Sequence, residues 1–349
     1  MTYMLISQRR YAAHGRLAAR ASVRGLTLVE LMIALMLGLL VVGSASAIFI
    51  SNRQTYRATE GLGRVQENGR IAFEMMARDL REAGGNACGN ADRDAPLKIV
   101  NILNANSNWW ANWNNGIIGY EGAMIPTQAN HIAGTDAVAL MSGESSSGVT
   151  VVSHNPSAAQ FQLNTVSHNL DDGDIAIVCD WRQASLFQVT NAQPEINTTV
   201  VHNSGGSVTP GNCSKGLGYA NPPKCTPNGT SYEYGENSMI VRLHAVRWYI
   251  GSTAGGGRSL FRSTLANQGG VLQARDQQIA EGVNNMQLQY LLEDGTGYID
   301  ATAVPADRWG DVTAVRVMLD LLSADGAGIG GAQLQRRIAH TVTLRNRME

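Results

Sequence analysis

The feature that most constrains this chain is a run of twenty consecutive uncharged residues at positions 31–50. Most of them are apolar, and as an α-helix the run would be about 30 Å long, which matches the hydrocarbon core of a bilayer. Residues 1–25 contain five arginines and no acidic residue. Because basic flanks stay on the cytoplasmic side, we expect this run to cross a membrane and the remainder of the chain to be exported.

Two ordinary interpretations compete for this segment. One is a secretory signal peptide, since residues 45–47 read Ala-Ser-Ala and offer a cleavage site before Ile48. The other is a plain single-span anchor. Neither explains Glu30, which is the single charged residue within positions 26–50. A carboxylate near the end of a membrane helix is either an acid that snorkels to the interface or a functional group.

The residues around Glu30 favour a functional role. Positions 24–32 read R-G-L-T-L-V-E-L-M, which resembles the class III signal of type IV prepilins and pseudopilins. In that family the leader is cut after the glycine, the new first residue is N-methylated, and a glutamate stands fifth in the mature chain. The resemblance therefore implies cleavage between Gly25 and Leu26, methylation of Leu26, and a subunit-alignment role for Glu30. A buried α-ammonium group needs a partner, and Glu30 lies about one helical turn from Leu26 of its own or a neighbouring subunit.

The helical pattern continues beyond the uncharged run. Apolar residues recur at helical spacing among charged ones, and Gly84-Gly85 follows as a C-cap signal; the apolar positions are Leu62, Val65, Phe73, Met76 and Leu80. We expect one helix over residues 26–83, about 87 Å long, with 26–50 as the membrane and filament-core part and 51–85 as an amphipathic stem. Several glycines interrupt it, either by simple tolerance or to let stems pack closely: Gly38, Gly43, Gly61, Gly63 and Gly69.

Residues 86–349 have the pattern of a β-rich head. Strand-like runs alternate with turn signals in a chain with 38 glycines and 9 prolines. The expected strands are 137–141, 149–153, 174–181, 186–190, 239–250, 259–262, 286–293, 312–322 and 338–345. Residues 171–174 and 294–297 read as hairpin turns, with calcium loops as a weaker alternative. The sequence thus predicts an α+β protein, with a long N-terminal helix and one large antiparallel β-rich head.

Four further segments are similar to minor pilins of the PilW type, which resemble the J-type pseudopilin of type II secretion. They are residues 77–84, 174–180, 281–290 and 341–346. The resemblance implies a minor pilin of a type IV pilus that primes assembly, caps the filament, and supports adhesion and twitching motility. Its implied partners are the prepilin peptidase, other minor pilins, the major pilin and a tip adhesin. It implies an inner-membrane location with the head in the periplasm, then the pilus surface.

Two alternatives remain open from the sequence. One is a J-type minor pseudopilin of a type II secretion system, and the other is a membrane-anchored periplasmic binding protein. Direct nucleic-acid binding is not expected. The chain has 27 basic and 28 acidic residues, so loss of the five leader arginines leaves 22 basic against 28 acidic residues, a net charge of −6.

The four cysteines suggest disulfides in an exported head, and four cysteines allow three pairings. Cys213 and Cys225 enclose a short polar loop, so we expect them to pair, which leaves Cys88 with Cys179. Zinc is the alternative, although no C-x-x-C or Cys/His cluster at zinc spacing occurs.

No catalytic motif, cofactor motif or metal motif stands out among the residues. The seven histidines form no H-E-x-x-H, and neither a G-x-S-x-G elbow nor a P-loop occurs. We therefore expect no enzymatic activity, no cofactor and no metal. Residues 101–115 hold seven asparagines and three tryptophans. This stretch is either an exposed adhesive or sugar-stacking patch, or a long loop whose tryptophans pack onto the sheet.

Overall fold

The computed structural model describes residues 25–347 apart from 86–97, 105–107, 112, 114–115, 123–124, 126–127, 145–147, 221–223, 324–325 and 327–330. The described chain divides into two compact units, Met1–Thr55 and Tyr56–Glu349. The first unit holds the apolar part of the N-terminal helix, and the second holds the rest of that helix and the β-rich head. The α+β class expected from the sequence is confirmed.

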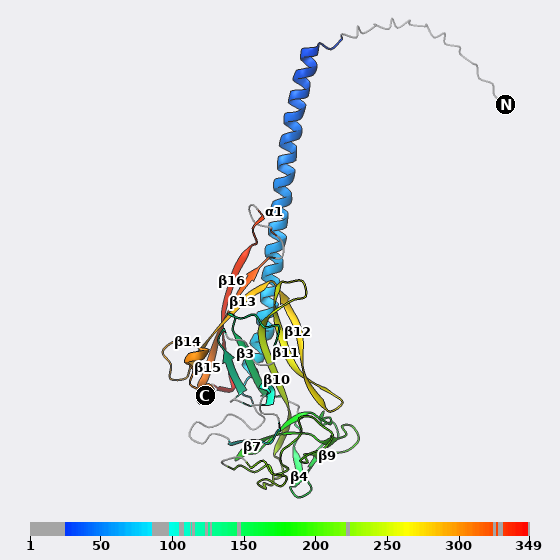
Figure 1. The fold of residues 1–349 in the computed structure, drawn as a ribbon, viewed down its shortest axis with the longest axis vertical. Helices are drawn as coiled ribbons and strands as arrows, with labels where there is room; N and C mark the ends of the chain where they lie inside the picture. Colours follow the sequence, from blue (N-terminus) through cyan, green and yellow to red (C-terminus); the bar gives the residue numbers. More distant parts are fainter. Residues whose placement is uncertain are drawn as a thin grey trace, which may run out of the picture. The chain divides into compact units, whose positions relative to one another are not determined.

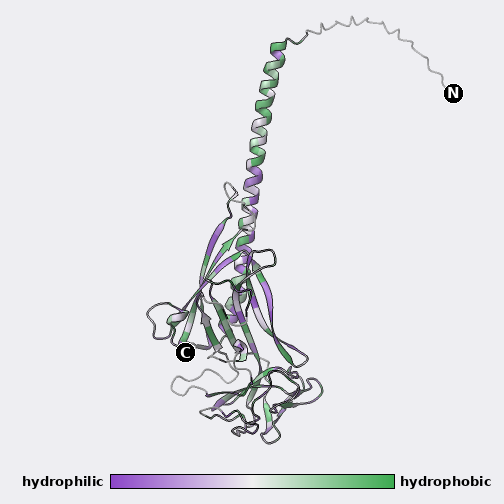
Figure 2. Cartoon of the chain, in the orientation of Figure 1, coloured by the Kyte–Doolittle hydropathy of each residue, from purple (hydrophilic) through white to green (hydrophobic). Residues whose placement is uncertain are grey.

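The N-terminal helix α1 spans Leu28–Glu82, 55 residues without interruption. Its first part is hydrophobic and its second part is mixed (Figure 2). The helix ends where glycine follows: Gly84 has φ +73°, a left-handed conformation that favours glycine at a helix C-terminus. The expected bounds of 26–83 were therefore correct to within two residues, and the Gly84-Gly85 stop signal was correct.

The largest of the three sheets in the described residues has eight strands, and Figure 1 labels several of them, including β3, β10, β11 and β12. The order β1-β7-β6-β10-β11-β12 forms its main path, β3 also pairs with β10, and β2 pairs with β3. All pairs are antiparallel except β1 with β7. Its strands are β1 (Lys98–Asn101), β2 (Ile117–Tyr120), β3 (Ala137–Gly143), β6 (Ile175–Cys179), β7 (Gln183–Gln188), β10 (Met239–Ser252), β11 (Arg258–Gln268) and β12 (Val271–Glu281).

Two four-stranded antiparallel sheets complete the head. The first has the order β14-β13-β15-β16, from Ile299–Asp300, Val283–Leu292, Val312–Leu322 and Gln335–Thr343. The second has the order β4-β5-β9-β8, from Val151–Asn155, Gln160–Leu163, Thr199–Val201 and Asn191–Ala192. Short 3-10 turns lie at Trp109–Ala111, Ala301–Ala303, Trp309–Asp311 and Arg345–Arg347.

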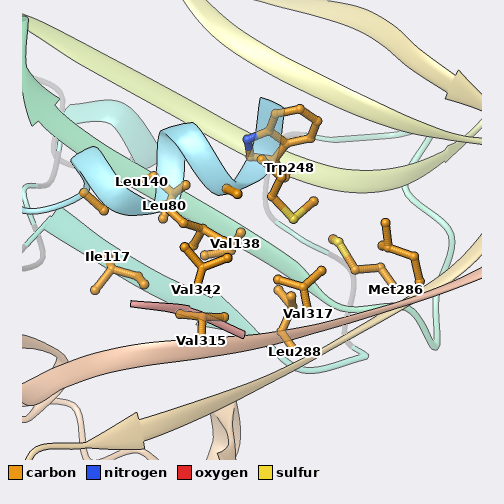
Figure 3. Close-up of a cluster of buried hydrophobic side chains, with 14 of the residues drawn as sticks. Leu80, Ile117, Val138, Leu140, Trp248, Met286, Leu288, Val315, Val317 and Val342 are labelled. Atoms are coloured by element: carbon orange, nitrogen blue, oxygen red, sulfur yellow. The ribbon is translucent and has the colours of Figure 1, made fainter. Parts of the chain in front are cut away.

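The main core lies between the second half of α1 and two of the sheets. Buried helix residues recur three or four positions apart, as a helix face requires, and they are Val65, Gly69, Ala72, Met76 and Leu80. All of them except Gly69 belong to one hydrophobic cluster, shown around Leu80 in Figure 3, with Val138, Leu140, Trp248, Met286, Leu288, Val315, Val317 and Val342. Strand β15 alternates buried and partly buried residues, so one of its faces contributes to this core.

One glycine fits against the end of the helix and explains how closely the helix meets the sheet. Gly116 has φ +81°, and a β-carbon there would lie 2.4 Å from the α-carbon of Gly84. The backbone N–H of Gly84 donates to the carbonyl oxygen of Met141 in β3 at 2.8 Å. The helix terminus is therefore docked on β3 by a backbone contact that leaves no room for a side chain.

A second core packs the small sheet against β6 and β7. Its members include Val151, Phe161, Phe187, Val200 and Tyr234. This region follows β3 and precedes β10 in the chain. It also contains the Cys213–Cys225 loop, whose Cys213 packs against the core.

Several strands were missed by the sequence analysis. Strands β1, β2, β5, β8, β9, β12 and β14 had no expected counterpart. Strand β12 is polar and mostly exposed at the edge of its sheet, so it lacks the apolar alternation that identifies a strand.

Candidate functional site

The N-terminal motif forms a capping box at the start of α1. The hydroxyl of Thr27 accepts a hydrogen bond from the backbone N–H of Glu30 at 3.2 Å. In return, a carboxylate oxygen of Glu30 accepts from the Thr27 backbone N–H at 3.3 Å and from the Thr27 hydroxyl at 3.1 Å. Two donors at the helix terminus are thereby satisfied reciprocally. Thr27 was missed as a functional partner, although T-x-x-E before an apolar run is a readable signal.

The first residues of the motif are exposed. Gly25, Leu26 and Thr27 precede the helix in non-helical backbone, and Leu26 is 73% exposed. The free α-amine that Glu30 is expected to pair with exists only after cleavage at Gly25. The pairing between Leu26 and Glu30 therefore stays a prediction, and in this chain the carboxylate of Glu30 is held by Thr27.

The apolar segment that follows is unburied within its own unit. Every residue from Leu28 to Ile50 is exposed. Helix α1 is long and apolar enough there to span a membrane, and none of its most apolar window is buried. A continuous apolar surface of this kind favours an apolar environment over water.

Asp79 connects the amphipathic part of α1 to the head. Its carboxylate is buried and accepts from Trp248 Nε1 at 2.8 Å, from Arg262 Nε at 2.8 Å, and from a second Arg262 nitrogen at 3.0 Å. The guanidinium and the indole satisfy the buried charge. No sequence signal separated Asp79 from its exposed acidic neighbours on the helix.

One of the two expected cysteine pairings is confirmed. Cys213 and Cys225 form a disulfide with their α-carbons 5.1 Å apart, a normal separation for a bridge. Cys179 is buried in β6. Its expected partner Cys88 lies outside the described residues, so the second pairing stays a prediction.

The tryptophans of residues 101–115 belong to the core. Trp109, Trp110 and Trp113 are 7%, 6% and 7% exposed and pack with strands β3, β6, β7 and β10. The adhesive interpretation of these tryptophans was wrong, because their rings are not available on the surface. The exposed tryptophan is instead Trp181, in the turn between β6 and β7.

The acidic residues 171–174 form a turn that leads into β6, but the expected hairpin was wrong, because β5 pairs with β4 and β9 whereas β6 pairs with β7 and β10. Gly173 has φ +92°, and the Asp174 N–H donates to the Asp171 carbonyl at 3.1 Å. Burial raises the pKa of Asp174, whose carboxylate accepts from Asn267 at 2.8 Å. The carboxylate of Asp172 accepts from the Ala192 N–H. These oxygens are therefore used by the fold, and the described residues contain no group of three or more potential metal ligands.

Two histidines form a buried pair in the second core. His154 Nε2 lies 3.1 Å from His202 Nε2, and His154 Nδ1 accepts from the Tyr234 backbone N–H at 3.1 Å. Phe161 stacks on His154 with ring centroids 4.1 Å apart. Burial lowers the pKa of His154 to about 4 and that of His202 to about 3. Both rings are therefore neutral at pH 7, which suits a packing role.

Comparison with known protein families gave two matches. Residues 247–336 match the family described as Type IV Pilus-assembly protein W, and residues 20–46 match the Prokaryotic N-terminal methylation motif. Comparisons with curated proteins and with solved structures gave no significant match. The first match runs from β10 to β16, the strands that enclose the helix core. The second covers Gly25, Leu26 and Glu30. The two matches support the assignment of the chain as a PilW-type minor pilin of the type IV pilus.

Proposed function

We propose that the chain is a minor pilin that primes assembly of a type IV pilus and caps the filament. One observation carries this proposal. The methylation motif matched at residues 20–46 overlaps the apolar part of α1, whose most apolar window is not buried at all. A pilin needs both features, because the same helix must first lie in the bilayer and later pack in the filament. The family matches point to a structural subunit without catalytic activity.

Processing begins at the leader. The prepilin peptidase cleaves between Gly25 and Leu26, and Leu26 becomes the N-methylated first residue. Glycine at the cleaved bond lets the protease approach the backbone closely. Support comes from the exposed, non-helical backbone at both residues, since a protease needs an extended and accessible substrate.

Glu30 has two successive partners in this proposal. Before assembly its carboxylate is satisfied by the Thr27 backbone N–H and hydroxyl. During assembly the carboxylate turns to the Leu26 amine of its own or a neighbouring subunit, because a charge entering an apolar filament core requires a counter-charge. The capping box thus lowers the cost of holding Glu30 ionised until that partner arrives.

The size of the head favours a position at the filament tip. A bulky head is easier to accommodate at a filament end than along a packed shaft. The chain assembles there with other minor pilins and a tip adhesin, the major pilin is added below, and the resulting pilus supports adhesion and twitching motility. Before assembly the head lies in the periplasm and residues 26–50 lie in the inner membrane; after assembly the subunit lies in the pilus at the cell surface.

Complementation of a deletion strain tests the assembly role. Gly25→Leu should leave uncut precursor and abolish piliation. Glu30→Ala should permit cleavage but impair assembly, whereas Thr27→Val, which removes only the capping hydroxyl, should retain most piliation. Normal piliation with Glu30→Ala would contradict the alignment role. Immunogold label distributed evenly along pili, instead of at their ends, would contradict the tip position.

A further inference from the structure

Trp181 is the most exposed large apolar side chain in the described part of the chain, with 81% of its surface accessible. A tryptophan buries about 150–250 Å² when it packs. Because burial of apolar surface is favourable, an exposed indole leaves this contact area available to a partner. Tryptophan, tyrosine and arginine are enriched among the residues that contribute most to binding at protein surfaces.

The turn that carries Trp181 is rigid. One carboxylate oxygen of Asp180 accepts from the backbone N–H groups of Arg182 and Gln183 at 2.7 and 3.0 Å. The other oxygen accepts from the hydroxyl of Tyr232 at 2.5 Å. The strands on either side, β6 and β7, are buried throughout. The indole is therefore held outward by a fixed backbone, so binding would cost little ordering of the turn.

Two cations lie over the exposed aromatic rings. The guanidinium of Arg182 is 4.5 Å from the centroid of the Trp181 ring. The ammonium of Lys98 is 5.1 Å from the centroid of Tyr219, which is 44% exposed. Both Tyr219 and Lys98 lie next to Gln183, two positions after Trp181. The Tyr219 N–H donates to Gln183 Oε1 at 3.2 Å, and Lys98 lies opposite Gln183 in the pairing of β1 with β7. We call these four residues, Trp181, Arg182, Tyr219 and Lys98, the Trp181 surface.

The charge of the Trp181 surface indicates an anionic ligand. Among the described residues neither Arg182 nor Lys98 forms an ion pair. The carboxylate of Asp180, the residue before Trp181, already accepts from two N–H groups and one hydroxyl. The cations are therefore available to a ligand, although the mature chain as a whole is acidic.

We propose that the Trp181 surface binds an acidic saccharide. The apolar C–H face of one sugar ring stacks on the face of Trp181 that Arg182 leaves free, and a sugar carboxylate is held by Arg182 or Lys98. A nucleic acid fits less well, because phosphate backbones require a track of several cations, and the whole chain contains three lysines. This inference goes beyond filament assembly and does not depend on it.

The test is a calorimetric titration of the full-length chain in detergent micelles with hexagalacturonate. The wild-type chain should bind, Trp181→Ala should bind at least about tenfold more weakly, and Arg182→Gln should lose affinity severalfold. Trp181→Phe should retain most binding. Ile196→Ala is the matched control, since Ile196 is a comparably exposed apolar side chain in another turn, at 74%. Its affinity should equal that of the wild-type chain.

Three results would overturn the proposal. They are no binding of hexagalacturonate by the wild-type chain, equal binding by Trp181→Ala, or tighter binding of a single-stranded oligonucleotide than of hexagalacturonate. Melting of each variant verifies its fold, and Arg182→Gln tests the surface without removing the ring. Because Trp181 lies outside the helix, Trp181→Ala should still support piliation. Saccharide binding and piliation are therefore measured separately, so the saccharide proposal can fail while the assembly role holds.

Discussion

The buried carboxylate of Asp79 in α1 forms a two-pronged ion pair with the guanidinium of Arg262 in β11, at 2.8 and 3.0 Å. The Trp248 indole N–H from β10 completes the site at 2.8 Å. One helix residue is thus tied to two strands of the large sheet. Because the buried carboxylate depends on these donors from the head, this arrangement selects a single rotation and register of the helix against the head.

Replacement of Asp79 should be costly. Asp79→Ala leaves the Arg262 guanidinium and the Trp248 N–H without their acceptor, and loss of one partner of such a pair costs about 3 kcal/mol. Glu74→Ala is the control on the same helix: its carboxylate is 64% exposed and lies 3.6 Å from Arg70. An exposed pair of this kind contributes at most about 1 kcal/mol. Denaturant unfolding in detergent measures both, and equal losses would contradict the role of Asp79.

The contact between Gly116 and Gly84 can be tested with a second glycine as its control. Gly116 and Gly134 have φ +81° and +86°, so alanine is strained at both, by about 1 kcal/mol. At Gly116 the added carbon also meets the backbone of Gly84 at 2.4 Å, whereas at Gly134 it meets nothing within 4 Å. We expect Gly116→Ala to lower the unfolding free energy by roughly 2 kcal/mol more than Gly134→Ala. Indistinguishable melting curves would show that the helix end is not docked in this way.

The Cys213–Cys225 disulfide should stabilise the second core. The two cysteines are 12 positions apart, and loop entropy assigns about 3 kcal/mol to closure of a loop of this size. The double variant Cys213→Ser/Cys225→Ser should therefore melt earlier than the wild-type chain. Peptide mapping without reductant should recover the two half-cystines in one linked fragment. Recovery of either cysteine linked to Cys179 would contradict the pairing.

The histidine pair predicts a loss of stability in acid. The pKa of His154 falls from 6.5 to about 4 on folding, and that of His202 to about 3, so the unfolded chain binds more protons below pH 6.5. Stability contributed by these neutral rings is present above pH 6.5 and declines as the pH falls towards 4. Each pKa unit corresponds to about 1.4 kcal/mol, so the melting temperature should fall by several degrees.

His154→Asn isolates this effect. An asparagine oxygen can replace Nδ1 as the acceptor for the Tyr234 N–H, while the titrating group is removed. The difference in melting temperature between pH 6.5 and pH 4.5 should be smaller in this variant than in the wild-type chain. His340→Asn, at an exposed position in β16, serves as the control and should leave the difference unchanged. The same pH dependence in all three proteins would exclude the buried pair as its source.

The sequence was most informative where one short pattern dictates one structure. The uncharged run at 31–50, the period of Val65, Met76 and Leu80, and the Gly84-Gly85 stop together defined α1 to within two residues. These signals are local: helix periodicity, membrane length and capping each depend on neighbouring residues. The strands around β10 and β15 were predicted for the same reason, because each is a long apolar run.

Features that depend on distant residues were not predicted. Asp79 resembles its exposed neighbours until Arg262 and Trp248, more than 160 positions away, are placed beside it. Trp109 and Trp181 are the same residue type in polar surroundings, yet one is buried and the other exposed. Their exposure follows from tertiary packing, which a single sequence does not encode locally. Edge strand β12 was missed because its exposed side chains carry no hydrophobic pattern.

The central claim is that the chain is processed and assembled as a pilin, and mass spectrometry of its mature N-terminal peptide tests this most directly. The subunit is purified from the membrane or from sheared pili, and the first peptide is sequenced. The account predicts a chain that begins at Leu26 and carries one added methyl group on its amine. A chain that begins at Ile48, or one that retains its leader, would contradict the account.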